Sequence, residues 1–231
     1  TSVHASLWEN NQPSEELFDT QTDPWEIKNL AADPAQEGLL TSMRGKLLKH
    51  MLEIRDTGLI PEPLFDTVRG DKTIMETVAD ASESECRDLL TIAFLASSGD
   101  PDGQEALEAA TKHKSPLARF WAHSGLVTLG KKASSSEKMI VAGLSDPVPL
   151  IRAQAAIALH NIGHKQSAIQ ALIKELDANL SVTNEAMIIN TLMQIRETKA
   201  IPKSWFNKWL NGKSGELRLG TLAKSVSMFH K

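Results

Sequence analysis

An internal helical repeat is the feature that most restricts how this chain can fold. The stretch "RFWAHSGLVTLG" at 119–130 aligns without a gap with "RAQAAIALHNIG" at 152–163, so that Arg119 coincides with Arg152 and Gly130 with Gly163. Within each stretch the apolar residues recur every three or four positions, which is the period of an amphipathic α-helix. A helical unit repeated at this spacing cannot bury its apolar stripe alone, so neighbouring units are expected to stack.

The same register extends the apolar pattern backward to 86–97 and forward to 185–196, although the arginine and the glycine are lost there. Each repeat then continues through a turn into a shorter second helix, expected at 104-112, 135-144, 165-177 and 202-211. This pattern predicts that residues 73-231 form an all-α fold, a solenoid of about four helical pairs whose end repeats differ from the central ones.

These pairs resemble the HEAT family of helical repeats. The resemblance is carried by "DPVPLIRAQAAIALHNIG" at 146–163, which has an Asp-Pro opening, an arginine one turn into the first helix, small alanines on the packing face and a closing glycine, and by "AIQALIKEL" as the second helix. It covers two repeats well and the outer two loosely. HEAT-like folds serve scaffolds, enzymes and appended modules, so the resemblance implies architecture and not chemistry.

Residues 1-72 do not follow the period of the repeat. Asp23-Pro24 and Asp33-Pro34 each place a capping aspartate before a proline suited to the first helical position. The first should start a single turn, and the second a long helix from about 34 to 56 that ends at Gly58. Its apolar face is expected to hold Leu39, Leu40, Met43, Leu47, Met51 and Ile54. "ELF" at 16–18 suits a segment that docks on something else, and 58–71 is predicted to be a connector.

"EELFDTQTDPWEIKNLA" at 15–31 resembles a motif near the end of bacterial arylsulfatase-like enzymes, in which Glu-Leu-Tyr-Asp-Leu is followed by Pro-x-Glu-x-x-Asn-Leu-Ala. Phe18 replaces the usual tyrosine and Thr20 the usual leucine. The long helix and "LEIRDTGLIPEPLF" at 52–65 are also similar to sulfatases that carry a helical-repeat tail. The resemblance implies that the chain is the C-terminal portion of a sulfatase, with residues 1-72 as its tail element and connector. The first residue is Thr1 and not Met, which indicates a chain that was either processed or cut from something longer.

The resemblance places the chemistry outside this sequence. Such sulfatases use a formylglycine made from Cys/Ser-x-Pro-x-Arg and a bound calcium ion, and both are expected only in a missing catalytic domain that precedes Thr1. Cys86 does not match this motif, because Asp88 stands where proline is needed and Leu90 where arginine is needed. No catalytic, cofactor or metal residue is therefore assigned here, and the chain alone is expected to be inactive. The resemblance also implies a periplasmic or extracellular location.

Composition sets further limits. No apolar run approaches the roughly 20 residues that span a bilayer, and a pI near 6.0 without an aromatic and basic stripe gives no support to nucleic-acid binding. The single cysteine excludes an internal disulfide. Cys86 is interpreted as a structural or merely buried thiol, and His160 and His164 as turn residues because no third metal ligand is visible. Asp19, Asp23 and Glu26 are interpreted as capping groups rather than a calcium site.

The C-terminal stretch at 199–231 is basic, because its lysines and arginine far outnumber its single acid, Glu216. The spacing of these charges suits the solvated face of a capping repeat. The alternative is that Lys203, Lys208 and Lys213 bind a sulfated polysaccharide by long-range attraction. Trp205, Phe206 and Trp209 are expected to close the core rather than to bind a ligand. Two other functions stay open for the whole chain: a free-standing HEAT-like interaction scaffold, and, with less support, an enzyme or nucleic-acid binder on the same scaffold.

Overall fold

The computed structural model describes residues 13–176, 182–197, 200, 203–204 and 207, and these residues form helices and turns with no strand among them. The α-helices are α1 Glu37–Ile54, α2 Phe65–Arg69, α3 Ile74–Asp80, α4 Glu83–Ser98, α5 Gln104–Ala110, α6 Pro116–Leu129, α7 Glu137–Gly143, α8 Pro149–Asn161, α9 Lys165–Leu176 and α10 Val182–Gln194. Short 3-10 helices precede several of them: η2 Pro34–Gln36, η3 Glu62–Leu64, η4 Pro101–Gly103 and η5 Gly130–Ser136. The all-α prediction is confirmed.

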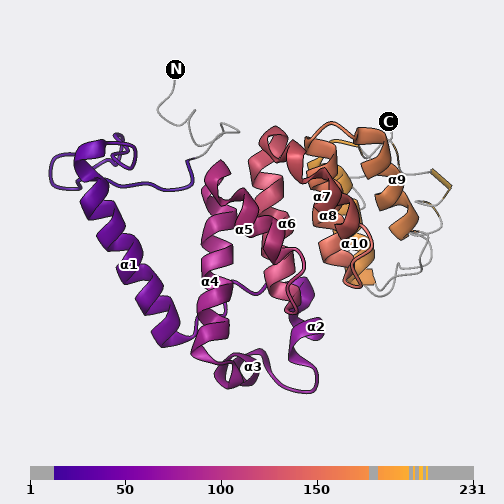
Figure 1. Ribbon diagram of the computed structural model, residues 1–231, viewed down its shortest axis with the longest axis horizontal. Helices are drawn as coiled ribbons and strands as arrows, with labels where there is room; N and C mark the ends of the chain where they lie inside the picture. The colour runs from indigo at the N-terminus through magenta and orange to yellow at the C-terminus, as the bar shows by residue number, and fades with distance from the viewer. Residues whose placement is uncertain (1–12, 177–181, 198–199, 201–202, 205–206, 208–231) are drawn as a thin grey trace.

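Helices α4 to α10 form the predicted solenoid (Figure 1). The first helices of successive pairs stack on one another, α4 on α6 and α6 on α8, and α10 packs against α8 and α9. The second helices expected at 104-112, 135-144 and 165-177 are confirmed as α5, α7 and α9, with η5 leading into α7. The one expected at 202-211 lies almost entirely outside the described residues.

Small residues let the stacked helices approach closely. Ala122 on α6 and Ala155 on α8 have no exposed surface. At Gly125 on α6, a Cβ atom would lie 2.9 Å from the Cα of Ala96 on α4, closer than real Cβ contacts come. The repeat therefore needs small side chains at this face, because helix axes this close leave no room for larger ones.

The long helix predicted at 34–56 is confirmed as η2 followed by α1. Asp33 caps η2, since its side chain accepts a hydrogen bond from the backbone N–H of Ala35. The predicted end at Gly58 is wrong: α1 ends at Ile54, and its C-cap residue Arg55 adopts a left-handed conformation with φ of 51°. The backbone N–H groups of Arg55 and Asp56 close the helix by bonding to Leu52 and Met51.

The connector predicted at 58–71 is more ordered than a loop. It contains η3 and α2, and its Ile60 and Leu64 are buried in one cluster with Leu117 and Ile151 of the solenoid. The indole Nε1 of Trp121 also donates a hydrogen bond to the carbonyl of Leu59, at 2.9 Å. Residues placed in the first segment by the sequence therefore pack into the core of the second, while the boundary at 72 itself stays a prediction.

Helix α1 projects from the solenoid (Figure 1). Its C-terminal end lies near α4, and its N-terminal end and the preceding loop extend away from the stacked helices. None of the helices in the described ranges is long and apolar enough to cross a bilayer. The projection matters for function because, among the described residues, few other parts of the chain cover it.

Candidate functional site

The N-terminal loop, residues 15–31, is held closed by one asparagine. The side-chain Oδ1 of Asn29 accepts hydrogen bonds from the backbone N–H groups of Leu17 and Ala31, both at 2.9 Å, and its Nδ2 donates to the carbonyl of Glu15 at 3.0 Å. The N–H of Leu30 donates to the carbonyl of Leu17 at 2.7 Å. These bonds bring the two ends of the sulfatase-like motif together. The loop is therefore built by the residues that define the motif.

Two aspartates shape the inside of this loop. Asp19 accepts hydrogen bonds from the N–H of Gln21 and the hydroxyl of Thr22, and the Thr22 bond is the main cause that lowers the pKa of Asp19. Asp23 accepts from the N–H groups of Ile27 and Lys28, at 2.8 and 2.7 Å. Both carboxylates thus bind backbone N–H groups of the loop, but no helix begins at Asp23, and its partners lie four and five residues on instead of the two or three of an N-cap.

Glu26, predicted to cap the same turn, adopts a left-handed conformation instead, with φ of 52°. Asp19 and Asp23 already accept hydrogen bonds from the backbone. In the described part of the chain, no three His, Cys, Asp or Glu side chains gather closely enough to hold a metal ion. "ELF" forms no strand, and Leu17 is buried by this chain itself while Phe18 is half-buried.

An ion pair attaches the N-terminal loop to α1. The guanidinium of Arg44 donates to both carboxylate oxygens of Glu15, with an Nε to Oε1 distance of 2.6 Å. This hydrogen bond is the main cause that lowers the pKa of Glu15. Because the two bonds are parallel, the pair fixes orientation as well as distance. The N-terminal loop and α1 therefore form one structural unit.

That unit exposes a row of apolar side chains. Of the apolar face predicted on α1, Leu40 is buried, whereas Leu39, Met43, Leu47 and Ile54 are about half exposed, at 51%, 48%, 49% and 54%. At about 100° per residue these four side chains fall within a quarter of the helix circumference. We call them the exposed α1 face.

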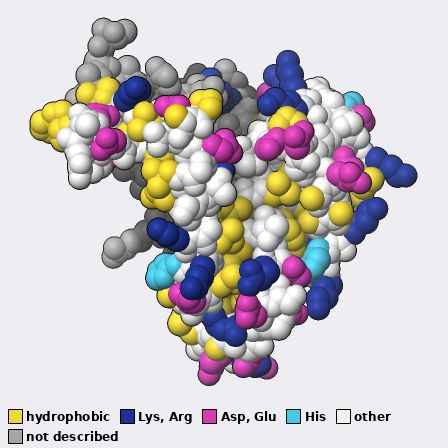
Figure 2. Space-filling view, turned by 60° about the vertical axis from the view of Figure 1, so that its left-hand side comes forward, with side chains coloured by type: hydrophobic (Ala, Val, Ile, Leu, Met, Phe, Trp, Pro, Cys, Tyr) yellow, Lys and Arg dark blue, Asp and Glu magenta, His cyan; other side chains and the backbone are white. Residues whose placement is uncertain are grey.

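The N-terminal loop adds two further apolar side chains at the surface, Trp25 at 82% exposed and Ile27 at 65%. Hydrophobic side chains are visible over this projecting part of the molecule in Figure 2. Single exposed apolar residues are common, but a row of them on one helix face is typical of a surface that another molecule or domain covers.

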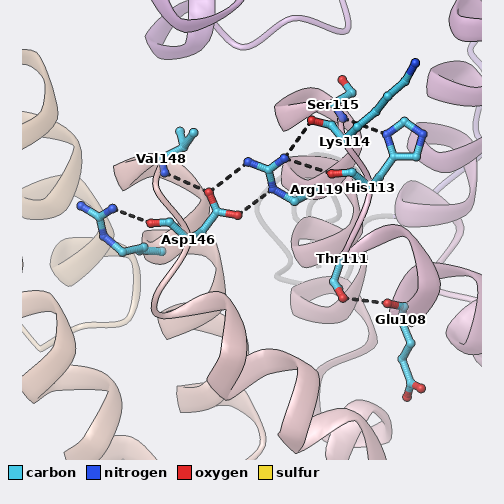
Figure 3. Close-up of polar contacts among 9 residues, drawn as sticks. Glu108, Thr111, His113, Lys114, Ser115, Arg119, Asp146 and Val148 are labelled. Carbon is cyan, nitrogen blue, oxygen red and sulfur yellow. Dashed lines mark hydrogen bonds and ion pairs between the residues drawn. The ribbon is translucent and has the colours of Figure 1, made fainter.

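Arg119 on α6 and Arg152 on α8 hold equivalent positions in successive repeats, and we call this series of arginines the arginine ladder. Figure 3 shows the contacts of Arg119. Arg119, near the start of α6, donates through Nη1 to the carbonyls of His113 and Lys114 in the turn before its own helix. Its Nε and Nη2 bind both oxygens of Asp146, at 2.7 and 3.3 Å. Asp146 also accepts a bond from the N–H of Val148, so it joins the turn before α8 to α6.

Arg152 repeats this arrangement one unit later. Its Nη1 donates to the carbonyl of Asp146, which coincides with His113 when the two repeats are aligned, and its Nε and Nη2 bind the two carboxylate oxygens of Glu175. The arginine at this position therefore has the same role in both repeats. Its Nη1 binds the turn before the helix, and its Nε and Nη2 bind a carboxylate. The arginines noted in the sequence alignment are therefore structural.

In the first repeat, the guanidinium at the equivalent position comes from an arginine outside the repeat. Cys86 coincides with Arg119 in the repeat register, and Arg55 at the end of α1 supplies the guanidinium there. Nη1 of Arg55 donates to the carbonyls of Val78 and Ala81 and lies 3.8 Å from the Sγ of Cys86. The sequence analysis missed this role because Arg55 lies outside the aligned repeats. The sequence signal that could have indicated it is the absence of an arginine at position 86.

The histidines and lysines singled out in the sequence have separate surroundings. His160 lies in the last turn of α8 and not in the predicted turn, whereas His164 precedes α9. Nε2 of His160 lies 3.7 Å from Glu197 and Nε2 of His164 lies 3.3 Å from Glu137, so the two imidazoles lie near different carboxylates. Lys203 is exposed. Lys208, Lys213, Trp205, Phe206 and Trp209 lie outside the described residues, so the polyanion-binding prediction stays a prediction.

A buried histidine was missed by the sequence analysis. His123 on α6 is 1% exposed, and its ring packs against Gly143, where an added Cβ would lie 2.2 Å from Cε1. Within the described residues Nδ1 of His123 is buried without a hydrogen-bond partner. Burial lowers the pKa of His123 to about 4, so the imidazole is neutral at neutral pH.

Comparison with known proteins finds two short similarities. The family described as PBS lyase HEAT-like repeat matches residues 151–178, which include α9 and most of α8. The "Ulvan-active sulfatase" of Formosa agariphila is 41% identical over 51 residues, which are 22% of this chain and 9% of that sulfatase. No solved structure shows a significant match. The chain is thus similar to a HEAT-like repeat and, over a short stretch, to a sulfatase of which it matches only a small part.

Proposed function

We propose that this chain is the non-catalytic C-terminal portion of a sulfatase, a sulfuric ester hydrolase, and that the exposed α1 face docks on its catalytic domain. The observation that carries the proposal is the row of half-exposed apolar side chains on α1, which an ion pair joins to the loop built from the sulfatase-like motif. The similarity to a sulfatase over 51 residues supports the same parent. Calcium and formylglycine belong to the catalytic domain.

Burial of the exposed α1 face would stabilise docking. Burying the exposed half of four aliphatic side chains stabilises a contact by roughly 1 kcal/mol each, or about 4 kcal/mol together. The Arg44 to Glu15 pair and the Asn29 bonds order the surface before anything binds, which reduces the entropy lost on docking. The helical repeats would then extend from the catalytic domain, where they complete the fold and assist substrate or partner binding.

Two finer roles follow from the same parent. A sulfated polysaccharide is the expected substrate class, and Lys203, Lys208 and Lys213 would hold it by long-range attraction. A periplasmic or extracellular location would suit an enzyme that acts on such a polymer. Exchanging these three lysines for glutamate should weaken retention on heparin if this part of the proposal is right.

The coding sequence before Thr1 is the first test. A sulfatase domain with Cys/Ser-x-Pro-x-Arg in the same reading frame is expected, and a signal peptide directly before Thr1 would favour a free-standing HEAT-like scaffold instead. The purified 231-residue chain should not hydrolyse 4-nitrophenyl sulfate; hydrolysis by this chain alone would refute its non-catalytic role.

The docking surface is tested in the full-length enzyme. Met43→Glu with Leu47→Glu places two charges on the exposed α1 face, and we expect a lower melting temperature or dissociation of the repeat region from the catalytic domain on limited proteolysis. The matched control is Thr41→Glu with Gly45→Glu, which adds the same charges at the same spacing on the far side of α1, where a side chain at Gly45 meets no other atom. Equal behaviour of the two double variants would refute docking through this face.

A further inference from the structure

A cleft opens where α1 meets the first units of the solenoid. Its volume is about 340 Å³, and its walls come from the C-terminal end of α1, the connector, α3, α4 and the start of α6. Most of the lining side chains are apolar, among them Leu59, Val78, Leu89 and Leu117. A concave, mainly apolar pocket of this size lies within the range of roughly 300 to 1,000 Å³ that is typical of small-molecule sites.

Comparison with Arg119 and Arg152 shows that Arg55, in this cleft, lacks a carboxylate partner. Arg119 and Arg152 each use Nη1 for backbone carbonyls and use Nε with Nη2 to bind a carboxylate in a fork. Arg55, which lines the cleft, uses Nη1 in the same way. In the described residues its Nε and Nη2 donate to no acceptor, and no carboxylate forms an ion pair with it. The edge of Arg55 formed by Nε and Nη2, which binds a carboxylate in Arg119 and Arg152, is therefore unoccupied by any described residue.

The acidic side chains around the cleft already have partners. Asp56 accepts a bond from the N–H of Gly58, Asp80 pairs with Lys72, and Glu85 caps α4 through Ser82 and pairs with Lys114. The only other lysine or arginine that lines the cleft within the described residues is Lys114, which is thus neutralised by Glu85. Asp56 keeps its charge, but among the described residues neither it nor any other carboxylate forms an ion pair with Arg55. The free N–H donors of Arg55 therefore favour an anion.

We propose that this cleft binds a small organic anion, an apolar body that carries one carboxylate or sulfate group, through the unoccupied edge of Arg55. The oxyanion takes the place that Asp146 takes on Arg119 and Glu175 on Arg152, while the apolar body lies against the aliphatic walls. A planar guanidinium suits both head groups, because each presents two oxygens to its parallel N–H donors. The site lies at the junction of α1 and the solenoid, and it does not depend on a sulfatase parent.

Cys86 provides the readout. It lines the cleft, is partly exposed and is the only cysteine in the sequence, so alkylation of the protein by iodoacetamide reports on this position. Sodium octanoate and sodium octyl sulfate are the anionic probes, and 1-octanol is the neutral probe of the same chain length. We expect the better anion to slow the alkylation of Cys86 at a concentration at least tenfold below that required of 1-octanol. The more effective anion identifies the head group that the site prefers.

Variants assign the effect to the cleft and to Arg55. Arg55→Met should remove the preference for anions over 1-octanol, and Arg55→Lys should keep part of it. Val78→Phe fills the cleft and should abolish protection by all three probes, whereas Met75→Phe, an exposed substitution on the same helix, should leave it intact. Val78 borders this cleft but not the neighbouring groove between α1 and α4, which Arg55 and Cys86 also border.

Three results would overturn the proposal of an anion site. Equal protection by 1-octanol and the anions in the wild-type protein, or no protection by any probe, would overturn the proposal. Unchanged protection of Cys86 in Val78→Phe would also overturn the proposal. Because Val78→Phe retains Arg55, this test remains valid even if Arg55→Met fails to fold. The sulfatase proposal has its own readout in the exposed α1 face, so failure of one leaves the other standing.

Discussion

Acidification tests the buried imidazole of His123 directly. Burial lowers its pKa from 6.5 to about 4 in the folded protein, and in the unfolded chain the imidazole is expected to regain the ordinary value. Between these two values the unfolded state binds a proton that the folded state does not. Stability is therefore fully present above pH 6.5 and is lost as the pH falls toward 4. The whole difference corresponds to about 3 kcal/mol of unfolding free energy, of which about 2 kcal/mol is lost by pH 5.

The assay is urea unfolding followed by far-ultraviolet circular dichroism at pH 7.5 and at pH 5.0. We expect the wild-type protein to lose about 2 kcal/mol between them, or about 4 to 8 °C in melting temperature for a protein of this size. His123→Leu keeps a side chain of similar volume and removes the titrating group, so its loss should be smaller by that amount. His50→Leu, at an exposed position, is the matched control and should behave as wild type.

Carboxylates do not obscure this window. Hydrogen bonds, chiefly from Arg44, Thr22, Thr73 and Ser82 respectively, lower the pKa values of Glu15, Asp19, Glu76 and Glu85. The stability that these acids contribute is present above the ordinary carboxyl pKa and is lost only as the pH falls below it. An equal loss between pH 7.5 and 5.0 in wild type and in His123→Leu would refute the reasoning, because the proton would then bind elsewhere.

Three further predictions concern packing and polar contacts. Gly143→Ala should cost about 1 to 3 kcal/mol in urea unfolding, since its Cβ would lie 2.2 Å from His123 and 2.9 Å from Ala155; a neutral effect would contradict that packing. Arg119→Met should cost about 3 kcal/mol because it leaves the carboxylate of Asp146 buried without its cation, whereas Arg44→Met, at an exposed pair, should cost less than about 1 kcal/mol. Asn29→Ala removes three hydrogen bonds and should speed trypsin cleavage at Lys28, with Thr20→Ala as an exposed control in the same loop; equal cleavage rates would contradict the closing role of Asn29.

The helical pairs were predictable because their determinants are local. Apolar residues at helical spacing fix the buried faces, and Pro116 and Pro149 occupy first-turn positions at the starts of α6 and α8. The capping of η2 by Asp33 was predictable for the same reason. By contrast, the exposure of Leu39 and Leu47 is not a local property, since the sequence shows which face is apolar but not whether anything covers it.

The end of α1 was mispredicted because a distant contact outweighs a local preference. Glycine adopts a left-handed conformation more easily than arginine, which favoured Gly58 as the stop. In the structure Arg55 takes that conformation, at a cost of roughly 1 kcal/mol, and its side chain binds the carbonyls of Val78 and Ala81. Hydrogen bonds from a charged donor are worth more than this cost. No single-sequence pattern reports a partner that lies so far along the chain.

The same contact explains why the arginine disappears from the alignment at position 86. A second guanidinium there would compete with Arg55 for the carbonyls before α4, so a small thiol at Cys86 leaves room for the side chain that arrives from α1. The ladder that joins one repeat to the next thus also joins α1 to the first repeat. A domain docked on the exposed α1 face would be held to the solenoid through Arg55, and an anion bound at the open edge of Arg55 would strengthen that junction by neutralising its charge.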